Sequence, residues 1–112
     1  MAEYCEKKGI YILTPDDPLY PERLKQIECP PAVLFCRGDV SCLSIEKSVA
    51  IIGTREPSDY SVAVAEEFSS FLAERGVNII SGFAMGIDTA AHRSAMRAGG
   101  STVAVMGCGA RI

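Results

Sequence analysis

The sequence predicts an α/β protein built around a parallel, Rossmann-like sheet. From residue 48 onward, short apolar runs alternate with helical patterns, which is typical of strand-helix-strand units. A loop that contains glycine follows each apolar run, and parallel strands place such loops at one edge of the sheet. We expect a three-layer arrangement, with residues 48–112 forming the first half of the domain.

Residues 1–47 are expected to form a short, proline-rich N-terminal extension with short strands and a helix. Apolar runs at 10–13 and 33–36 lie between prolines that interrupt regular structure. Residues 20–27 predict a short helix, because Pro21 suits its first turn. Two apolar residues fall on one face of this helix: Leu24 and Ile27.

Three strands of the sheet are predicted at 49–52, 77–80 and 102–106. Between the first two, we expect a helix that begins near Asp59, is capped by Ser58 or Asp59, and ends at Gly76. Apolar residues at helical spacing predict its buried face: Val64, Phe68, Phe71 and Leu72.

A second helix is predicted between the second and third strands. Asp88 is expected to cap its N-terminus, and Gly99 and Gly100 to end it. Its apolar face is small: Ile87, Ala91, Ala95 and Ala98. Such a face would let the helix lie close to the sheet.

The loop after the first strand has the residue types of a phosphate-binding loop. Gly53 lets the backbone approach a ligand, Thr54 offers a hydroxyl, and Arg55 carries a planar fork that matches phosphate. The helix that begins after Ser58 favours an anion through its amides and dipole. By itself, this motif also fits an ordinary capped turn with an exposed Arg55.

The loop after the second strand predicts a second part of the same pocket. Ser81, Gly82, Gly86 and the amides between them can surround a phosphate. The stretch lacks the Gly-x-Gly-x-x-Gly fingerprint and the Gly-Lys-Ser/Thr of a P-loop, so nicotinamide cofactors and nucleoside triphosphates are poor candidates. No cofactor is expected.

Asp88 and His92 lie one helical turn apart, as a carboxylate-imidazole pair would. No serine or cysteine nucleophile has a clear place beside them, so we favour a local helix-end interaction in which His92 supports the pocket. Gly107 and Gly109, after the third strand, are expected to complete the pocket floor. No catalytic residue is predicted.

Composition limits the kind of protein that this pocket serves. The net charge of −3 excludes a broadly basic surface, so any DNA contact must be local. The five cysteines include no Cys-x-x-Cys pair and the chain has one histidine, so no metal site is expected. No apolar stretch is long enough to span a membrane and no signal-peptide pattern is present, so we expect a cytoplasmic protein.

Taken together, the motifs resemble the DprA/Smf family of DNA-processing proteins. The strongest element is Ser-Gly-Phe-Ala-Met-Gly-Ile-Asp at 81–88, followed by Ala-His at 91–92. The other elements precede it in order: Tyr-Pro-Glu-Arg-Leu at 20–24, the Pro-Pro stretch at 30–38, and Ala-Ile-Ile-Gly-Thr-Arg at 50–55 with Ser58 and Tyr60.

The resemblance implies binding of single-stranded DNA, protection of incoming strands during natural transformation, and loading of the RecA recombinase. It also implies that Arg55, with the backbone of Gly53 and Thr54, holds a DNA phosphate in a pocket lined by residues 81–86. Homodimers are implied for intact members of the family. Asp88 and His92 match family positions that we interpret as architectural.

The chain departs from the family pattern at Ser61, where glycine is usual, and at Arg111, where aspartate is common. The family's sheet continues through further strands, so we expect a truncated protein of marginal stability. Of the functions that the resemblance implies, RecA loading is the one that depends most on those further strands.

Two other function classes remain open at this point. A nucleoside-monophosphate phosphoribohydrolase of the LOG type shares a related fold, but its Pro-Gly-Gly-x-Gly-Thr loop does not occur in this chain. A regulatory module that senses a mononucleotide also fits the pocket chemistry. The DNA-binding interpretation, without catalysis, accounts for more of the motifs.

Overall fold

The computed structural model describes residues 9–82 and 85–106, and these residues divide into two compact units. The first unit runs through Ser44 and the second covers Ile45–Met106. The sequence predicted this division between residues 47 and 48. In the described part of the chain, no helix combines the length and hydropathy needed to cross a bilayer.

The first unit is a small antiparallel hairpin with two short helices. Strand β1 (Ile10–Leu13) pairs with β2 (Leu34–Arg37), and the 3₁₀ helix η1 (Val40–Ser44) follows. Three buried residues form the core of this unit: Leu13, Tyr20 and Val40. The Tyr20 hydroxyl donates to the Pro31 carbonyl at 2.7 Å, which ties the loop before β2 to this core.

The predicted helix at 20–27 is present but shorter. Helix α2 (Glu22–Lys25) begins after Pro21, which occupies the N-cap position. Leu24 packs against the core of this unit, whereas Ile27 lies outside the helix and is 49% exposed. The prediction that both residues share a buried face was therefore wrong for Ile27, because the helix ends before reaching it.

The second unit contains a parallel sheet of three strands. Strands β3 (Ser48–Ala50), β4 (Asn78–Ser81) and β5 (Thr102–Ala104) lie in the order β3-β4-β5. Both pairs are parallel, with Val49 opposite Ile79 and Ile80 opposite Val103. The predicted order is confirmed, with strand ends displaced by one or two residues.

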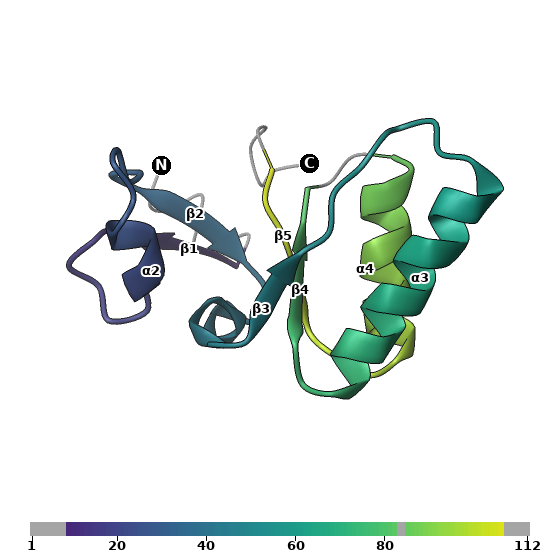
Figure 1. Ribbon diagram of the computed structural model, residues 1–112. Helices are drawn as coiled ribbons and strands as arrows, with labels where there is room; N and C mark the ends of the chain where they lie inside the picture. The colour runs from purple at the N-terminus through teal and green to yellow at the C-terminus, as the bar shows by residue number, and fades with distance from the viewer. Residues whose placement is uncertain (1–8, 83–84, 107–112) are drawn as a thin grey trace. The chain divides into compact units, whose positions relative to one another are not determined.

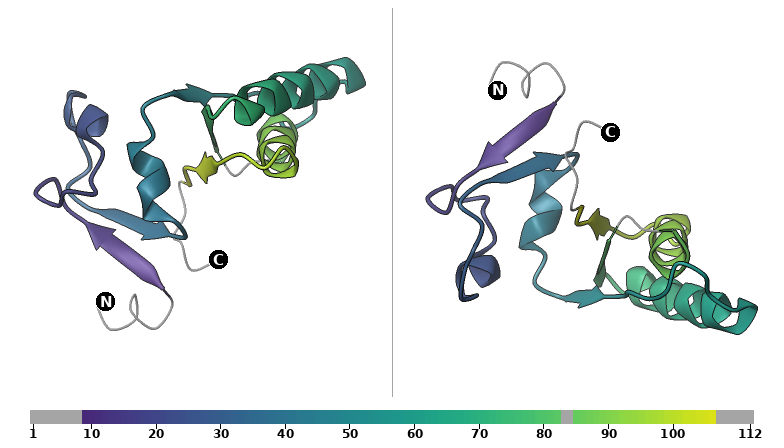
Figure 2. Two further views of the ribbon diagram at one scale, coloured as in Figure 1. Left: turned by 90° about the horizontal axis from the view of Figure 1, so that it is seen from below. Right: turned by 90° about the horizontal axis from the view of Figure 1, so that it is seen from above.

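Helices α3 (Asp59–Glu74) and α4 (Ile87–Arg97) connect these strands and lie on one face of the sheet (Figures 1 and 2). The described residues thus supply the sheet and one helical layer of the expected three-layer fold. Ser58 is the N-cap of α3, where its hydroxyl accepts the Ser61 amide hydrogen at 3.1 Å, as the sequence indicated.

The buried face of α3 differs from the predicted one. Phe68 and Phe71 are 60% and 51% exposed, whereas three small residues at four-residue spacing are buried: Ala65, Ser69 and Ala73. These small residues face α4, whose Ala91 and Ala95 are completely buried. Two helices with small residues at their contact approach closely, and no phenylalanine fits there.

Candidate functional site

Two loops meet at the carboxyl ends of β3 and β4, at the top of the sheet in Figure 1. The Ile87 amide, the first of α4, donates to the Thr54 carbonyl at 3.2 Å and so joins the loops. Gly86 precedes it with φ of 89°, and a β-carbon there would collide with the Thr54 carbonyl and lie 2.9 Å from the Arg55 carbonyl carbon. Only glycine satisfies both the backbone angle and the close approach.

The buried side chain of Asp88 also links these two loops. Its carboxylate is 6% exposed and accepts the Gly53 amide hydrogen at 3.3 Å. A β-carbon at Gly82 would lie 2.7 Å from the other carboxylate oxygen, so glycine at that position makes room for this side chain. The Gly53 amide, which the sequence assigned to a phosphate, is therefore held by the protein's own carboxylate.

The predicted capping role of Asp88 was wrong. The N-cap of α4 is Gly86, which makes no side-chain cap, and Asp88 lies inside the first turn. Its carboxylate bonds across to another loop rather than to its own helix. Because that partner is 35 residues away in the sequence, local capping patterns gave no signal of it.

His92 supports the site, but it does not pair with Asp88. Its Nε2 lies 2.6 Å from the Gly82 carbonyl, and its Nδ1 lies 2.7 Å from the Thr102 hydroxyl, which itself donates to the Ile79 carbonyl. The expected Asp88–His92 contact was therefore wrong. Both ring nitrogens therefore have hydrogen-bond partners within the protein.

The predicted serine ligands also act within the protein. Ser81 is 3% exposed, and its hydroxyl donates to the Ile51 carbonyl across the sheet. Ser58 uses its hydroxyl as the cap of α3. Neither hydroxyl presents an unused donor to a ligand at the loop edge. Gly107 and Gly109 lie outside the described residues.

Four of the predicted ligands are exposed: Gly53, Thr54, Arg55 and Ser58. The Thr54 hydroxyl oxygen accepts the Glu56 amide hydrogen at 3.2 Å. Within residues 9–82 and 85–106, Arg55 has no hydrogen-bond or ion-pair partner. Its guanidinium is thus available to an external anion at the point where the two loops meet.

Comparison with known proteins decides the family. The family model described as DNA recombination-mediator protein A matches residues 11–112. Protein Smf of Synechocystis is 40% identical over 110 residues, and DNA processing protein DprA of Bacillus subtilis is 38% identical over 109 residues. The chain belongs to the DprA/Smf family. Those alignments cover 96% and 97% of the chain but 28% and 36% of the relatives, so the chain spans about a third of their length.

Solved DprA structures have the same fold. DNA processing protein A of Streptococcus pneumoniae superposes with a TM-score of 0.84 at 33% identity, covering 100% of this chain and 40% of that one. The Helicobacter pylori protein, whose structure concerns a single-stranded DNA binding mode, has a TM-score of 0.81 at 31% identity, covering 92% and 45%. The Rossmann-like fold expected from the sequence is confirmed for this DprA/Smf chain.

This DprA/Smf chain also has two grooves in its second unit that sequence analysis missed. One, of about 620 Å³, lies between β3 and α3 and has mainly apolar walls, including Ile52, Val64 and Phe68. The other, of about 480 Å³, lies between α3 and α4 and includes Arg93 and Arg97. The four-residue spacing of these arginines is visible in the sequence, but no local pattern shows that α3 forms the other wall of the groove.

Three of the five cysteines lie in the part of the chain that the structure describes. No group of three or more potential metal-binding side chains lies close together in the described ranges. Cys29, Cys36 and Cys42 form no disulfide within the described residues, and burial raises the pKa of the Cys36 thiol. Burial also raises the pKa of Cys42, with a smaller effect from the nearby Asp39 carboxylate.

Proposed function

We propose that this chain binds single-stranded DNA through its phosphate backbone, with Arg55 as the main ligand. The observation that carries the proposal is the exposed Arg55, which has no partner among the described residues and lies at the junction of two glycine loops, in a family whose Helicobacter pylori member is described as binding single-stranded DNA. Asp88 and His92 hold the two loops together beneath it.

The internal carboxylate changes how the phosphate would be held. Asp88 already takes the Gly53 amide hydrogen, so the ligands proposed for DNA are Arg55 and the Thr54 hydroxyl rather than the Gly53 backbone. An arginine fork recognises phosphate oxygens and carries no information about bases. Binding should therefore be nearly independent of sequence and should favour flexible single strands over duplex.

Arg55→Ala tests the proposal. Fluorescence anisotropy with labelled oligo-dT should show weaker binding at low salt and a slope of log affinity against log salt smaller by about 0.7, the single-strand value for one phosphate. Arg55→Lys should retain most of the slope but recover only part of the affinity, because lysine keeps the charge and loses the fork.

Arg75→Ala is the matched control. The Arg75 side chain lies at the opposite end of α3, where it stacks 3.5 Å from the Phe71 ring centroid and donates to the Phe71 carbonyl at 2.8 Å. Its removal should leave DNA binding unchanged. A loss of binding in Arg75→Ala together with wild-type binding in Arg55→Ala would contradict the assignment.

The wider role follows the family and is part of the proposal. We propose that the chain acts in the cytoplasm by binding rather than by catalysis, in DNA processing and recombination. In the intact family, DNA transfer to RecA and homodimer formation would involve regions that this chain does not cover. Release of ribose phosphate from AMP by the purified chain would favour the phosphoribohydrolase alternative instead.

A further inference from the structure

The groove between α3 and α4 has the features of a second anion site. It has a volume of about 480 Å³ and includes these residues: Glu66, Met85, Gly86, Thr89, Arg93 and Arg97. Of these residues, Gly86 alone was assigned to DNA binding from the sequence. The groove is open and combines apolar with charged groups, which suits an extended ligand more than a buried small molecule.

Arg93 and Arg97 provide its positive charge. They are four residues apart on α4, a spacing that places their β-carbons about 5–6 Å apart on one helix face. Both are exposed, and neither has an ion-pair or hydrogen-bond partner anywhere in the described ranges. The negative end of the α4 dipole stabilises Arg97 in the last turn, but Arg93 lies too far from it to be explained in this way.

The Glu66 carboxylate also lines the groove. Its oxygens lie more than 4.0 Å from the guanidinium nitrogens of Arg93 and Arg97, so it forms no ion pair with either side chain. Asp88, the acidic residue of α4, is buried and turned toward Gly53. Among the described residues that line the groove, two cations therefore face a single acidic side chain. This excess of positive charge is local, in a chain whose net charge is −3.

The groove begins at the candidate site already described. Gly86, which lines it, lies against the backbone of Thr54 and Arg55. From there the groove follows α4 past Arg93 to Arg97, and the ten steps of helix from Ile87 to Arg97 span about 15 Å. A linear polyanion that contacts Arg55 could continue along this path.

We infer that Arg93 and Arg97 bind successive phosphates of the same single strand that Arg55 contacts. The inference rests on the proposed function and extends its site along α4. The described residues that line the groove include no aromatic side chain, so they would neutralise the backbone without stacking bases. Its contribution should therefore be strongly salt-dependent and independent of base sequence.

The test compares a thymidine dinucleotide, whose single internucleotide phosphate can occupy only one of these positions, with oligo-dT of about 16 nucleotides, the upper end of the range that single-strand sites occupy. In the double variant Arg93→Ala/Arg97→Ala, the slope of log affinity against log salt for the longer strand should be smaller by about 1.4, which is 0.7 for each phosphate contact removed. The shorter strand, held at Arg55, should bind as it does to wild type. Arg93→Lys/Arg97→Lys should keep the slope for the longer strand.

Glu66→Gln provides a change in the opposite direction. Removing the carboxylate that lines the groove should strengthen binding of the longer strand at low salt, a gain that a purely structural role for the arginines would not produce. Arg75→Ala, which removes one positive charge from outside the groove, is the control for net charge.

The outcomes separate the two proposals. If Arg55→Ala weakens both strands while the arginine double variant binds both like wild type, the groove is not part of the path and the proposed function stands. If the double variant binds both strands more weakly than wild type by the same factor, its effect is not specific to the groove and the inference fails. If wild type binds neither strand, both proposals are wrong.

Discussion

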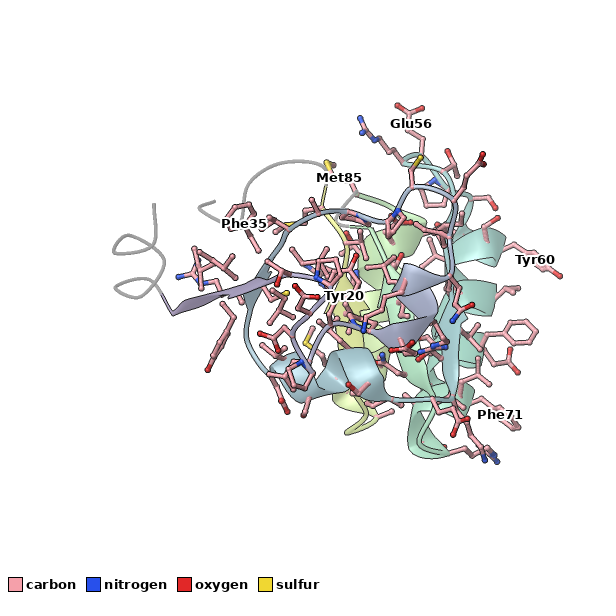
Figure 3. All side chains as sticks on the ribbon, turned by 90° about the vertical axis from the view of Figure 1, so that its left-hand side faces the viewer. Tyr20, Phe35, Glu56, Tyr60, Phe71 and Met85 are labelled. Carbon is pink, nitrogen blue, oxygen red and sulfur yellow. The ribbon has the colours of Figure 1, made fainter. Side chains whose placement is uncertain are left out.

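The two sides of α3 differ in a way that residue size alone does not suggest. The side toward α4 is made of small residues, and Ala65, Ser69 and Ala73 are all nearly inaccessible to solvent. On the other side, Tyr60 and Phe71 project from the helix into solvent, as Figure 3 shows, and they are 71% and 51% exposed. Burial along this helix follows the partner surface rather than the hydrophobicity of the side chain.

The close contact explains the small side. The Ser69 hydroxyl donates to the Ala91 carbonyl at 2.6 Å, which places the two helix backbones one side chain apart. A β-carbon at Gly100 would lie 2.6 Å from that of Ala73, so the turn after α4 also presses on α3. Packing at this density tolerates neither added volume nor an unpaired polar group.

No described residue of the second unit packs against the large side in this way. β3 pairs with β4 along one edge, and the apolar groove between β3 and α3 remains open. An exposed apolar surface of this kind commonly marks an interaction site or an aggregation hazard. The contrast predicts that substitutions on the two sides of one helix have very different consequences.

The largest effect is expected from Ala73→Leu. The extra methyl groups would meet the Gly100 turn and force the helices apart, which should lower the free energy of unfolding by about 2 to 3 kcal/mol. Urea denaturation followed by circular dichroism measures the loss. A stability equal to wild type would show that the α3–α4 contact is looser than described.

A smaller loss is expected from Ser69→Ala, which removes the buried hydrogen bond to the Ala91 carbonyl. The free energy of unfolding should fall by about 1 kcal/mol. Ser70→Ala, one residue along the same helix and outside this contact, is the control and should unfold like wild type. Alanine favours helix more than serine does, so equal losses in both variants would show that the Ser69 hydrogen bond is not the cause.

Phe71→Ala should cost less still, although it deletes an aromatic ring. The ring is 51% exposed, and the interaction lost is the stacking of Arg75 over it. A cation–π contact at an exposed site contributes about 0.5 to 1 kcal/mol. A loss as large as that of Ala73→Leu, in the same urea experiment, would contradict the contrast between the two sides.

The smallest effect on folding is expected from Phe68→Ser, because the ring is 60% exposed on the open side. The midpoint of unfolding should be almost unchanged. Self-association of the purified chain, measured by sedimentation velocity, should decrease, since the variant removes part of the apolar groove. Tighter self-association in Phe68→Ser would show that this surface is not responsible.

Several features of the candidate site followed from residue types. Gly82 and Gly86 were expected in a tight loop around a phosphate, and the structure places them instead against Asp88 and the Thr54–Arg55 backbone, while Arg55 is in an exposed loop as expected. Sequence analysis missed the groove with Arg93 and Arg97, although the i, i+4 spacing was available, because nothing local shows that α3 provides the opposite wall.

The sequence by itself determined the order of the strands and helices, the parallel sheet and the end of the sheet at which the loops gather. These features follow from hydrophobic periodicity and from turn residues, which act over a few neighbouring positions. Only the tertiary structure decided that α3 buries its alanines rather than its phenylalanines, and that the Gly53 amide belongs to Asp88. Both depend on which distant segment comes close enough to fill the space or to accept the hydrogen bond, and no local pattern encodes that distance.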